Sequence, residues 1–309
     1  MKDRTLLVAE FLATPWAMER TRLTSITETV AGWSLGRPHA DDAEGGVDDG
    51  RPRQSTWEAR RAAAQAMSPD GSIAILPLMG VLVPRANMVT EWCGGTSVMQ
   101  WVQSFNQLVA DSTVSTILIE SDSPGGSVYQ VPEAAATIMA ARAQKRIVSI
   151  ANSVSASASY WLSSCASECY VTPSGEVGSV GVYQAHDDYS AALAEAGIKR
   201  TYVSSGENKV EGAPEMPLSE SARAFMQQRC DEYYADFTGS LAKARGIPLA
   251  KVLADFGGGR CYGAQGALAA GMVDGICTLP ELLSRLASNR PAGAASRRAA
   301  AERRLRLAS

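Results

Sequence analysis

The sequence predicts an α/β protein with parallel strands. Two short apolar runs, residues 114–120 and 146–151, have the composition of buried strands, and each is followed by a turn and a helical pattern. This alternation is typical of a parallel sheet, because parallel neighbours need a crossover connection. A length of 309 residues allows one large domain with appendages, or two domains. A composition of 46% hydrophobic and 20% charged residues is ordinary for a soluble globular protein.

Composition divides the chain into four expected regions. Residues 1–35 predict a leader of one or two short helices, and residues 36–70 form an acidic, Gly-rich linker. A compact domain is expected over residues 71–287. Residues 288–309 form a basic, Ala-rich tail that favours a short amphipathic helix or disorder.

Within the compact domain, helical and strand periodicities set the order of elements. The first half predicts a bent strand or strand pair over 73–82, a helix over 96–109, a buried strand over 114–120 with a Pro-Gly-Gly turn after it, a helix over 128–143 and a strand over 146–151. The second half predicts a buried helix over 157–165, short strands over 169–171 and 181–183, a helix over 187–196, a strand over 200–203, and a long helix from an N-cap at Ser219 to about Arg245.

Charge and residue counts exclude several classes of function. The net charge of −3 does not suggest a nucleic-acid partner, and no apolar run reaches the length that spans a membrane, so we expect neither and place the protein in the cytoplasm. The six cysteines form no CxxC pair and are expected to be free thiols. With only His39 and His186 available, a histidine-rich metal site is not expected, and no Walker motif indicates a nucleotide, so we expect no cofactor.

Three segments carry candidate chemistry, and the first is Asp122-Ser-Pro-Gly-Gly-Ser127. Its glycines permit backbone geometries that a Cβ forbids, and unpaired N–H groups there could stabilise an oxyanion. A structural turn explains the same residues, because Pro-Gly-Gly turns are common in proteins.

The second segment, Ser153-Val-Ser-Ala-Ser-Ala-Ser-Tyr-Trp161, also follows a buried strand. A serine at a strand-to-helix turn can act as a nucleophile, although several serines compete here and a helix cap would account for them too.

The third segment is Gly206-Glu-Asn-Lys-Val-Glu-Gly212. Lys209 could serve as a general base if it were desolvated, whereas Glu207 and Glu211 favour a solvated loop.

Together these segments form an ordered set of motifs. The set comprises Ser123-Pro-Gly-Gly126, Ala156-Ser-Ala-Ser-Tyr-Trp161, Pro173 followed by Val177-Gly-Ser-Val-Gly-Val182, Ser205-Gly-Glu-Asn-Lys209, and a late pattern of Arg260, Tyr262, Ala267, Gly271, Val273 and Asp274. In this order the sequence resembles the signal peptide peptidase A family of serine peptidases over roughly residues 70–287, and within it the phage prohead (capsid maturation) proteases.

The resemblance implies a crotonase-like (Clp-protease-like) α/β spiral and a Ser-Lys catalytic dyad. Ser157 would be the nucleophile and Lys209 the general base, both from one chain 52 positions apart, with Gly125, Gly126 and the N–H of Ala158 forming the oxyanion hole. Ala158 and Ser159 stand where the family commonly has glycines, so Ser155 and Ser159 remain alternatives to Ser157.

The resemblance also implies partners and leaves alternatives open. Expected substrates are capsid, scaffold or portal proteins within an assembling prohead in the host cytoplasm, and family members usually form homo-oligomers. A cellular soluble peptidase of the same family is the first alternative, and a non-catalytic assembly partner is the second. A Ser-His pair using His186, 29 residues after Ser157, is an alternative mechanism.

Overall fold

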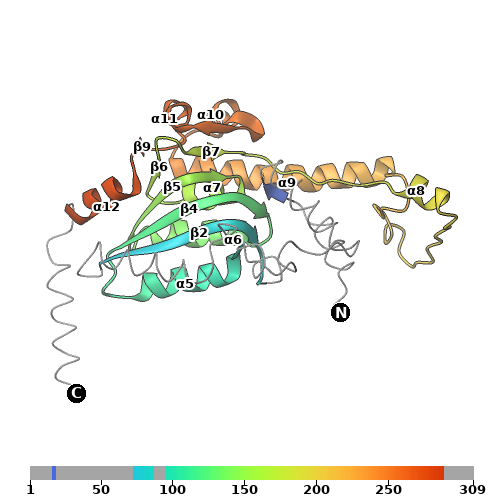
Figure 1. The fold of residues 1–309 in the computed structure, drawn as a ribbon, viewed down its shortest axis with the longest axis horizontal. Helices are drawn as coiled ribbons and strands as arrows, with labels where there is room; N and C mark the ends of the chain where they lie inside the picture. Colours follow the sequence, from blue (N-terminus) through green and yellow to red (C-terminus); the bar gives the residue numbers. More distant parts are fainter. Residues whose placement is uncertain (1–15, 19–71, 87–94, 289–309) are drawn as a thin grey trace, which may run out of the picture.

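The computed structural model describes residues 16–18, 72–86 and 95–288 (Figure 1). The acidic linker over 36–70, the basic tail from 289 onward and all of the leader except residues 16–18 lie outside these ranges. Residues 16–18 form a strand rather than the helix expected there.

Nine strands in the described residues form one sheet. They are β1 (Trp16–Met18), β2 (Ile73–Val83), β3 (Thr96–Ser97), β4 (Thr116–Ser127), β5 (Arg146–Ala156), β6 (Glu168–Val171), β7 (Glu176–Gly178), β8 (Cys261–Gly263) and β9 (Gly275–Ile276). The main order is β3-β2-β4-β5-β6-β9, with β1 on β4 and β7 between β5 and β8. All pairings are parallel except β1 with β4 and β7 with β8, which confirms the predicted parallel α/β architecture.

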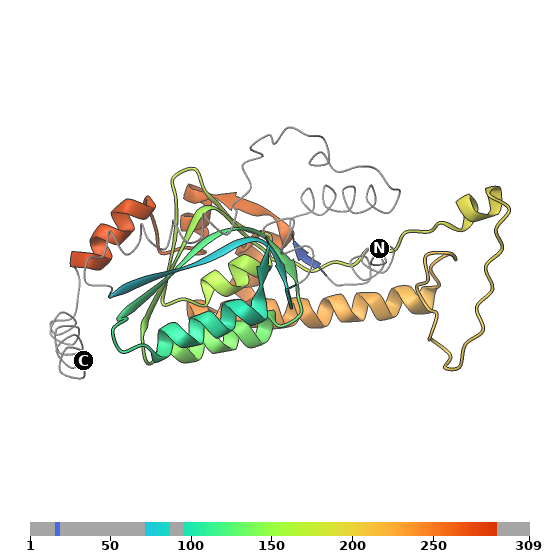
Figure 2. The same cartoon turned by 60° about the horizontal axis from the view of Figure 1, so that its bottom comes forward.

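Helices cover both faces of this sheet. They are α5 (Val98–Ala110), α6 (Val131–Ala141), α7 (Ala158–Ser164), α8 (Ser190–Glu195), α9 (Glu220–Arg245), α10 (Leu249–Asp255), α11 (Ala264–Ala270) and α12 (Leu279–Ser288), with a 3-10 turn at Gly257–Gly259. Because side chains alternate along a strand, Ile117 and Ile119 of β4 pack with α5, α6, α7 and α9, whereas Leu118 packs with α12 on the other face. Figure 2 shows α5 and α6 lying together against one face of the sheet.

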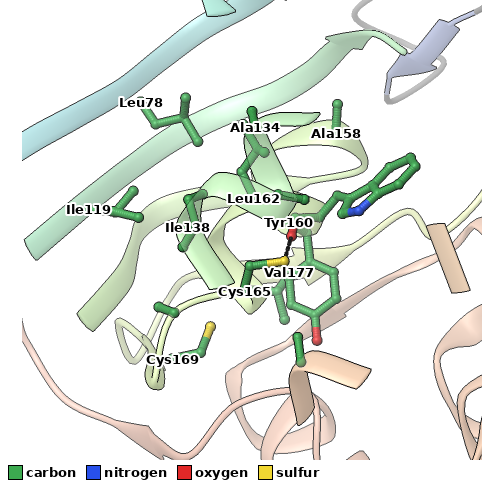
Figure 3. Packing of buried hydrophobic residues seen from close by; sticks show 14 of the residues in the cluster. Leu78, Ile119, Ala134, Ile138, Ala158, Tyr160, Leu162, Cys165, Cys169 and Val177 are labelled. Atoms are coloured by element: carbon green, nitrogen blue, oxygen red, sulfur yellow. Dashed lines mark hydrogen bonds between the residues drawn. The ribbon is translucent and has the colours of Figure 1, made fainter. Parts of the chain in front are cut away.

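The helix α7 lies at the centre of the larger core. All seven of its residues are buried, and the ring of Trp161 stacks on Phe237 of α9 with centroids 4.5 Å apart. Tyr160 packs beside Phe256 and donates its hydroxyl to the carbonyl of Met272 at 2.8 Å. This apolar surround, seen in Figure 3, fixes the start of α7 relative to the sheet.

Three expected elements differ from the structure. Pro-Gly-Gly is not a turn, because β4 continues through Ser127. Its register shifts between Asp122 and Gly125 against β2, and between Ser121 and Ser123 against β5, and such irregularities accommodate a proline, which has no N–H. The strand expected at 181–183 lies instead at β7, which begins five residues earlier. Residues 200–203 are an exposed loop, since their β propensity has no neighbouring strand to pair with.

Candidate active site

The turn between β5 and α7 is built around Ser157. Its backbone has φ 54° and ψ −120°, a conformation that residues with a Cβ rarely adopt. The Ser157 N–H donates to the carbonyl of Gly178 at 2.7 Å, and its carbonyl accepts from the Trp161 N–H at 2.8 Å. The side chain does not cap α7. A strained serine between a strand and a helix is the arrangement found in hydrolase nucleophile elbows.

Neighbouring serines are held in a buried hydroxyl network. The Ser159 Oγ lies 2.6 Å from the Ser121 Oγ and 3.2 Å from the Ser155 Oγ, and Ser155 donates to Ser163 at 3.1 Å. By contrast, the Ser157 Oγ makes a long 3.5 Å contact with the carbonyl of Gly181. Of Ser155, Ser157 and Ser159, therefore, Ser157 has the hydroxyl least engaged by other groups.

The end of β4 that carries Gly125 and Gly126, which we call the glycine strand, lies beside this turn. β4 and β5 last pair at Ser123 opposite Ser155, so Gly125 and Ser157 each lie two residues beyond the same pair. Gly125 has φ 96°, and a Cβ on Gly126 would lie 1.9 Å from the Leu82 carbonyl oxygen, so both positions require glycine. The N–H of Ala158 begins α7 and has no partner within that helix. Backbone donors and a serine thus meet at one end of the sheet.

A thiol near the turn does not compete as a nucleophile. Burial raises the pKa of Cys165 to about 12, and its sulfur donates to the Trp161 carbonyl at 3.2 Å (Figure 3). At neutral pH this group stays protonated and inert.

Lys209 lies elsewhere in the molecule, on a projection that we call the arm (residues 186–230). The arm comprises α8, the loop after it and the first eleven residues of α9, and Figures 1 and 2 both show it extending away from the sheet. Lys209 is exposed, and the neighbouring Glu211 accepts a hydrogen bond from Ser221 near the start of α9.

Ser157 and Lys209 are therefore attached to opposite ends of α9. Trp161, one turn after Ser157, stacks on Phe237, and the sixteen helical steps from Ser221 to Phe237 span about 24 Å. A lysine side chain cannot cross that distance. Although the two residues belong to the same sequence, one chain in this conformation does not bring them together.

His186 follows β7 at the base of the arm. Its Nε2 is buried and has no hydrogen-bond partner in the described part of the chain. None of the hydrogen bonds described for Ser157 involves His186, so this geometry adds nothing to the Ser-His alternative.

Within the described residues, no group of three or more His, Cys, Asp or Glu side chains is arranged to hold a metal ion. No helix within these ranges combines the length and apolar character needed to cross a membrane.

A strained serine beside a glycine strand, at the end of a parallel sheet, is typical of α/β hydrolytic enzymes. Residues 139–292 match Peptidase family S49. The chain therefore carries a domain of peptidase family S49, which includes Ser157, Lys209 and the whole arm.

Sequence comparison adds relatives from phages and bacteria. The chain is 33% identical to the "Capsid assembly protease C" of Escherichia phage lambda over 82% of its own length and 55% of that protein. It is 32% identical to the "Head-tail preconnector protein GP5" of Enterobacteria phage P21, over 70% of this chain and 43% of the relative. A "Putative signal peptide peptidase SppA" of Enterococcus faecium is 28% identical over 57% of this chain and 51% of its own length. The chain thus spans about half the length of these curated relatives, and it is related to both phage head proteases and signal peptide peptidases.

Sequence reasoning missed two parts of this site. The carbonyl of Gly178, which fixes the Ser157 turn, belongs to a motif that was recognised without a role, and its φ of 135° marks it as a special backbone position. The pairing of β1 with the glycine strand had no signal, because a three-residue strand is too short to show periodicity.

Proposed function

We propose that this protein is a serine endopeptidase of the capsid maturation type. The observation that carries the proposal is the strained Ser157 turn beside Gly125 and Gly126, with a hydroxyl left out of the buried serine network. The match to the phage lambda protease extends over 82% of this chain and the match to the Enterococcus faecium peptidase over 57%, which supports a phage or prophage role over a cellular one. Proposed substrates are capsid, scaffold or portal proteins inside an assembling prohead in the host cytoplasm.

In the proposed mechanism, Lys209 as a neutral amine removes the proton from the Ser157 hydroxyl. The Ser157 oxygen then attacks a peptide carbonyl, and the N–H groups of Gly126 and Ala158 stabilise the oxyanion that forms, with Gly125 shaping the strand beside them. The ammonium formed on Lys209 gives the proton to the leaving nitrogen, and water hydrolyses the acyl-enzyme. This chemistry requires no metal and no cofactor.

The general base reaches Ser157 from a second copy of the chain. Within one chain the two residues are held at opposite ends of α9, and Lys209 is exposed to solvent. The arm also exposes large apolar side chains that a partner would cover, namely Tyr189, Ile198, Tyr202, Val203 and Phe225. Assembly of a homo-oligomer would both desolvate Lys209 and deliver it to a neighbouring Ser157.

Finer features of the architecture belong to the same proposal. The strand order β2-β4-β5-β6, with parallel neighbours joined by helices, supports a crotonase-like spiral. We place the peptidase domain over residues 71–287, with a leader and linker before it and a basic tail after it.

The direct test incubates the purified chain with candidate capsid and scaffold proteins and identifies the products by mass spectrometry. Ser157→Ala is expected to lower cleavage at least about a thousandfold, because it removes the attacking oxygen. Matched variants Ser155→Ala and Ser159→Ala, which alter only the buried network, should keep cleavage within about tenfold. Loss of activity in Ser155→Ala or Ser159→Ala with retention in Ser157→Ala would move the nucleophile, and cleavage by none of the chains would leave an assembly role.

A further inference from the structure

The strand β1 pairs with the glycine strand of the candidate active site. Its three residues run antiparallel to the end of β4, with Trp16 opposite Ser127, Ala17 opposite Gly126 and Met18 opposite Gly125. Figures 1 and 2 both show this blue strand at the end of the sheet where β4 finishes. Residues 17 and 18 thus pair with Gly126 and Gly125, the two glycines of the proposed oxyanion hole.

The edge that β1 occupies is the one facing the nucleophile. A strand has two edges, and β2 takes one of them, with Val81 opposite Gly125. β5 takes the other edge as far as the pair Ser123 and Ser155, then turns away at Ser157. β1 therefore continues along the edge that β5 leaves, and its direction from Trp16 to Met18 leads toward Ser157.

An extended peptide substrate would need this same edge. Peptides commonly bind by adding a strand to an exposed sheet edge, where main-chain hydrogen bonds supply affinity. Here Gly125, Gly126 and Ser157 are all buried, as expected of an edge already covered. A pairing of only three residues is weak by itself and can be reversed.

We propose that residues 16–18 are an internal occupant of the peptide-binding edge and inhibit the protease until a substrate or an assembly step displaces them. This inference rests on the proposed function, because only a peptidase would use the edge for substrates. Tethering gives β1 a high effective concentration, in the millimolar range for flexible connections, so substrates at micromolar concentration compete poorly against it.

The test removes the main-chain hydrogen bonds of β1 in the full chain. Successive N–H groups of a strand point to opposite sides, so the double substitution Ala17→Pro with Met18→Pro removes whichever one faces β4. The matched control, Ala17→Val with Met18→Val, keeps both N–H groups and favours a strand.

The first readout is binding, measured in a Ser157→Ala background so that nothing is cleaved. The probe is a fluorescein-labelled peptide with the sequence of residues 12–22, followed by fluorescence anisotropy. The proline variant should bind it at least about tenfold more tightly than the unmodified chain and the valine control. Equal affinities, or no binding to any of the three chains, would overturn the proposal. If the proline variant does not fold, a site for a specific protease inserted after Arg22 releases β1 from the folded chain, with the same result expected.

The second readout is proteolysis of casein with Ser157 intact. The proline variant should show an initial rate about tenfold above the unmodified chain, and an unchanged rate would contradict inhibition by β1. If no chain cleaves any protein while the difference in peptide binding persists, the proposed endopeptidase function fails and the occupied edge stands.

Discussion

The buried end of the sheet and the arm are opposites in construction. All seven residues of α7 are buried, the Trp161 ring stacks on Phe237, and the Ser157 turn is fixed by hydrogen bonds on both sides. Along the arm, α8 has no buried residue, and Val203 is 96% exposed. The first region holds the Ser157 turn in place without help from another molecule. The arm buries little apolar surface within the single chain, so a partner is needed to cover its exposed apolar side chains.

This contrast separates the two halves of the proposed dyad. The nucleophile turn is complete in one chain, while the base lies on the surface that needs a partner. Catalysis would therefore depend on assembly, so a dilute, unassembled chain would cleave little. If the protein acts inside a growing capsid, as proposed, such dependence would confine activity to the site where copies are concentrated.

The largest effect is expected from mixing two inactive variants. Ser157→Ala and Lys209→Ala should each lose at least about a thousandfold in activity, because each removes one member of the dyad. In mixed oligomers, an intact Ser157 from one variant meets an intact Lys209 from the other, so activity should return to about a quarter of the wild-type level when copies mix at random. Casein hydrolysis before and after co-refolding measures this. Lack of recovery in oligomers proven to be mixed would mean that the dyad forms within one chain.

The next largest effect is a difference in stability between substitutions of two phenylalanines on α9. Phe237→Ala should lower the free energy of unfolding by about 3–5 kcal/mol, since it leaves a cavity beneath the stacked Trp161 ring. Phe225, 58% exposed on the arm, has no such packing, so Phe225→Ala should change stability by less than about 0.5 kcal/mol.

The same pair distinguishes folding from assembly. Phe225→Ala should shift the protein toward smaller species in analytical ultracentrifugation while its urea midpoint stays constant. Phe237→Ala should lower that midpoint instead. If Phe225→Ala leaves both assembly and activity intact, the arm is not the interface between copies.

The buried region could be predicted from the sequence to a much greater extent than the arm. Residues 146–156 and 158–164 combine a β-branched run with small residues, and these patterns follow directly from packing against a sheet, so strand, turn and buried helix were all expected. The loop at 200–203 has the local composition of a strand, yet pairing requires a neighbour that no local pattern reveals. The distance between Lys209 and Ser157 could not be predicted either, because it depends on the length and direction of α9 and not on the spacing of the motifs. The choice among the serines also needed the structure, since only the hydroxyl network distinguishes Ser157 from Ser155 and Ser159.

The smallest effect concerns an ion pair that supports the buried region. Arg245 at the end of α9 donates two hydrogen bonds to Asp274, at 2.7 and 2.8 Å, and Asp274 also accepts from the Cys169 N–H of β6 at 2.7 Å. Burial alone would raise the pKa of Asp274, but the hydrogen bonds from Arg245 and Cys169 outweigh it, and the pKa lies below the usual value of 3.8.

A lowered carboxylate pKa in the folded state stabilises the protein above the unfolded pKa, and that contribution disappears as the pH falls through the folded pKa. Asp274→Asn keeps the shape and one acceptor oxygen but loses the charge. Since the Asp274 side chain is 39% exposed and partly screened, the substitution should cost about 1 kcal/mol or less at pH 7. Urea unfolding of wild type and Asp274→Asn at pH 7, 5 and 3 gives the difference in their free energies of unfolding. This difference, or gap, should be constant from pH 7 to 5 and narrow by pH 3. The control is Lys251→Gln, in an exposed ion pair on α10, which should show little gap from wild type at any pH. A gap that widens on acidification would mean that the charge of Asp274 does not stabilise the packing of α9 on the sheet.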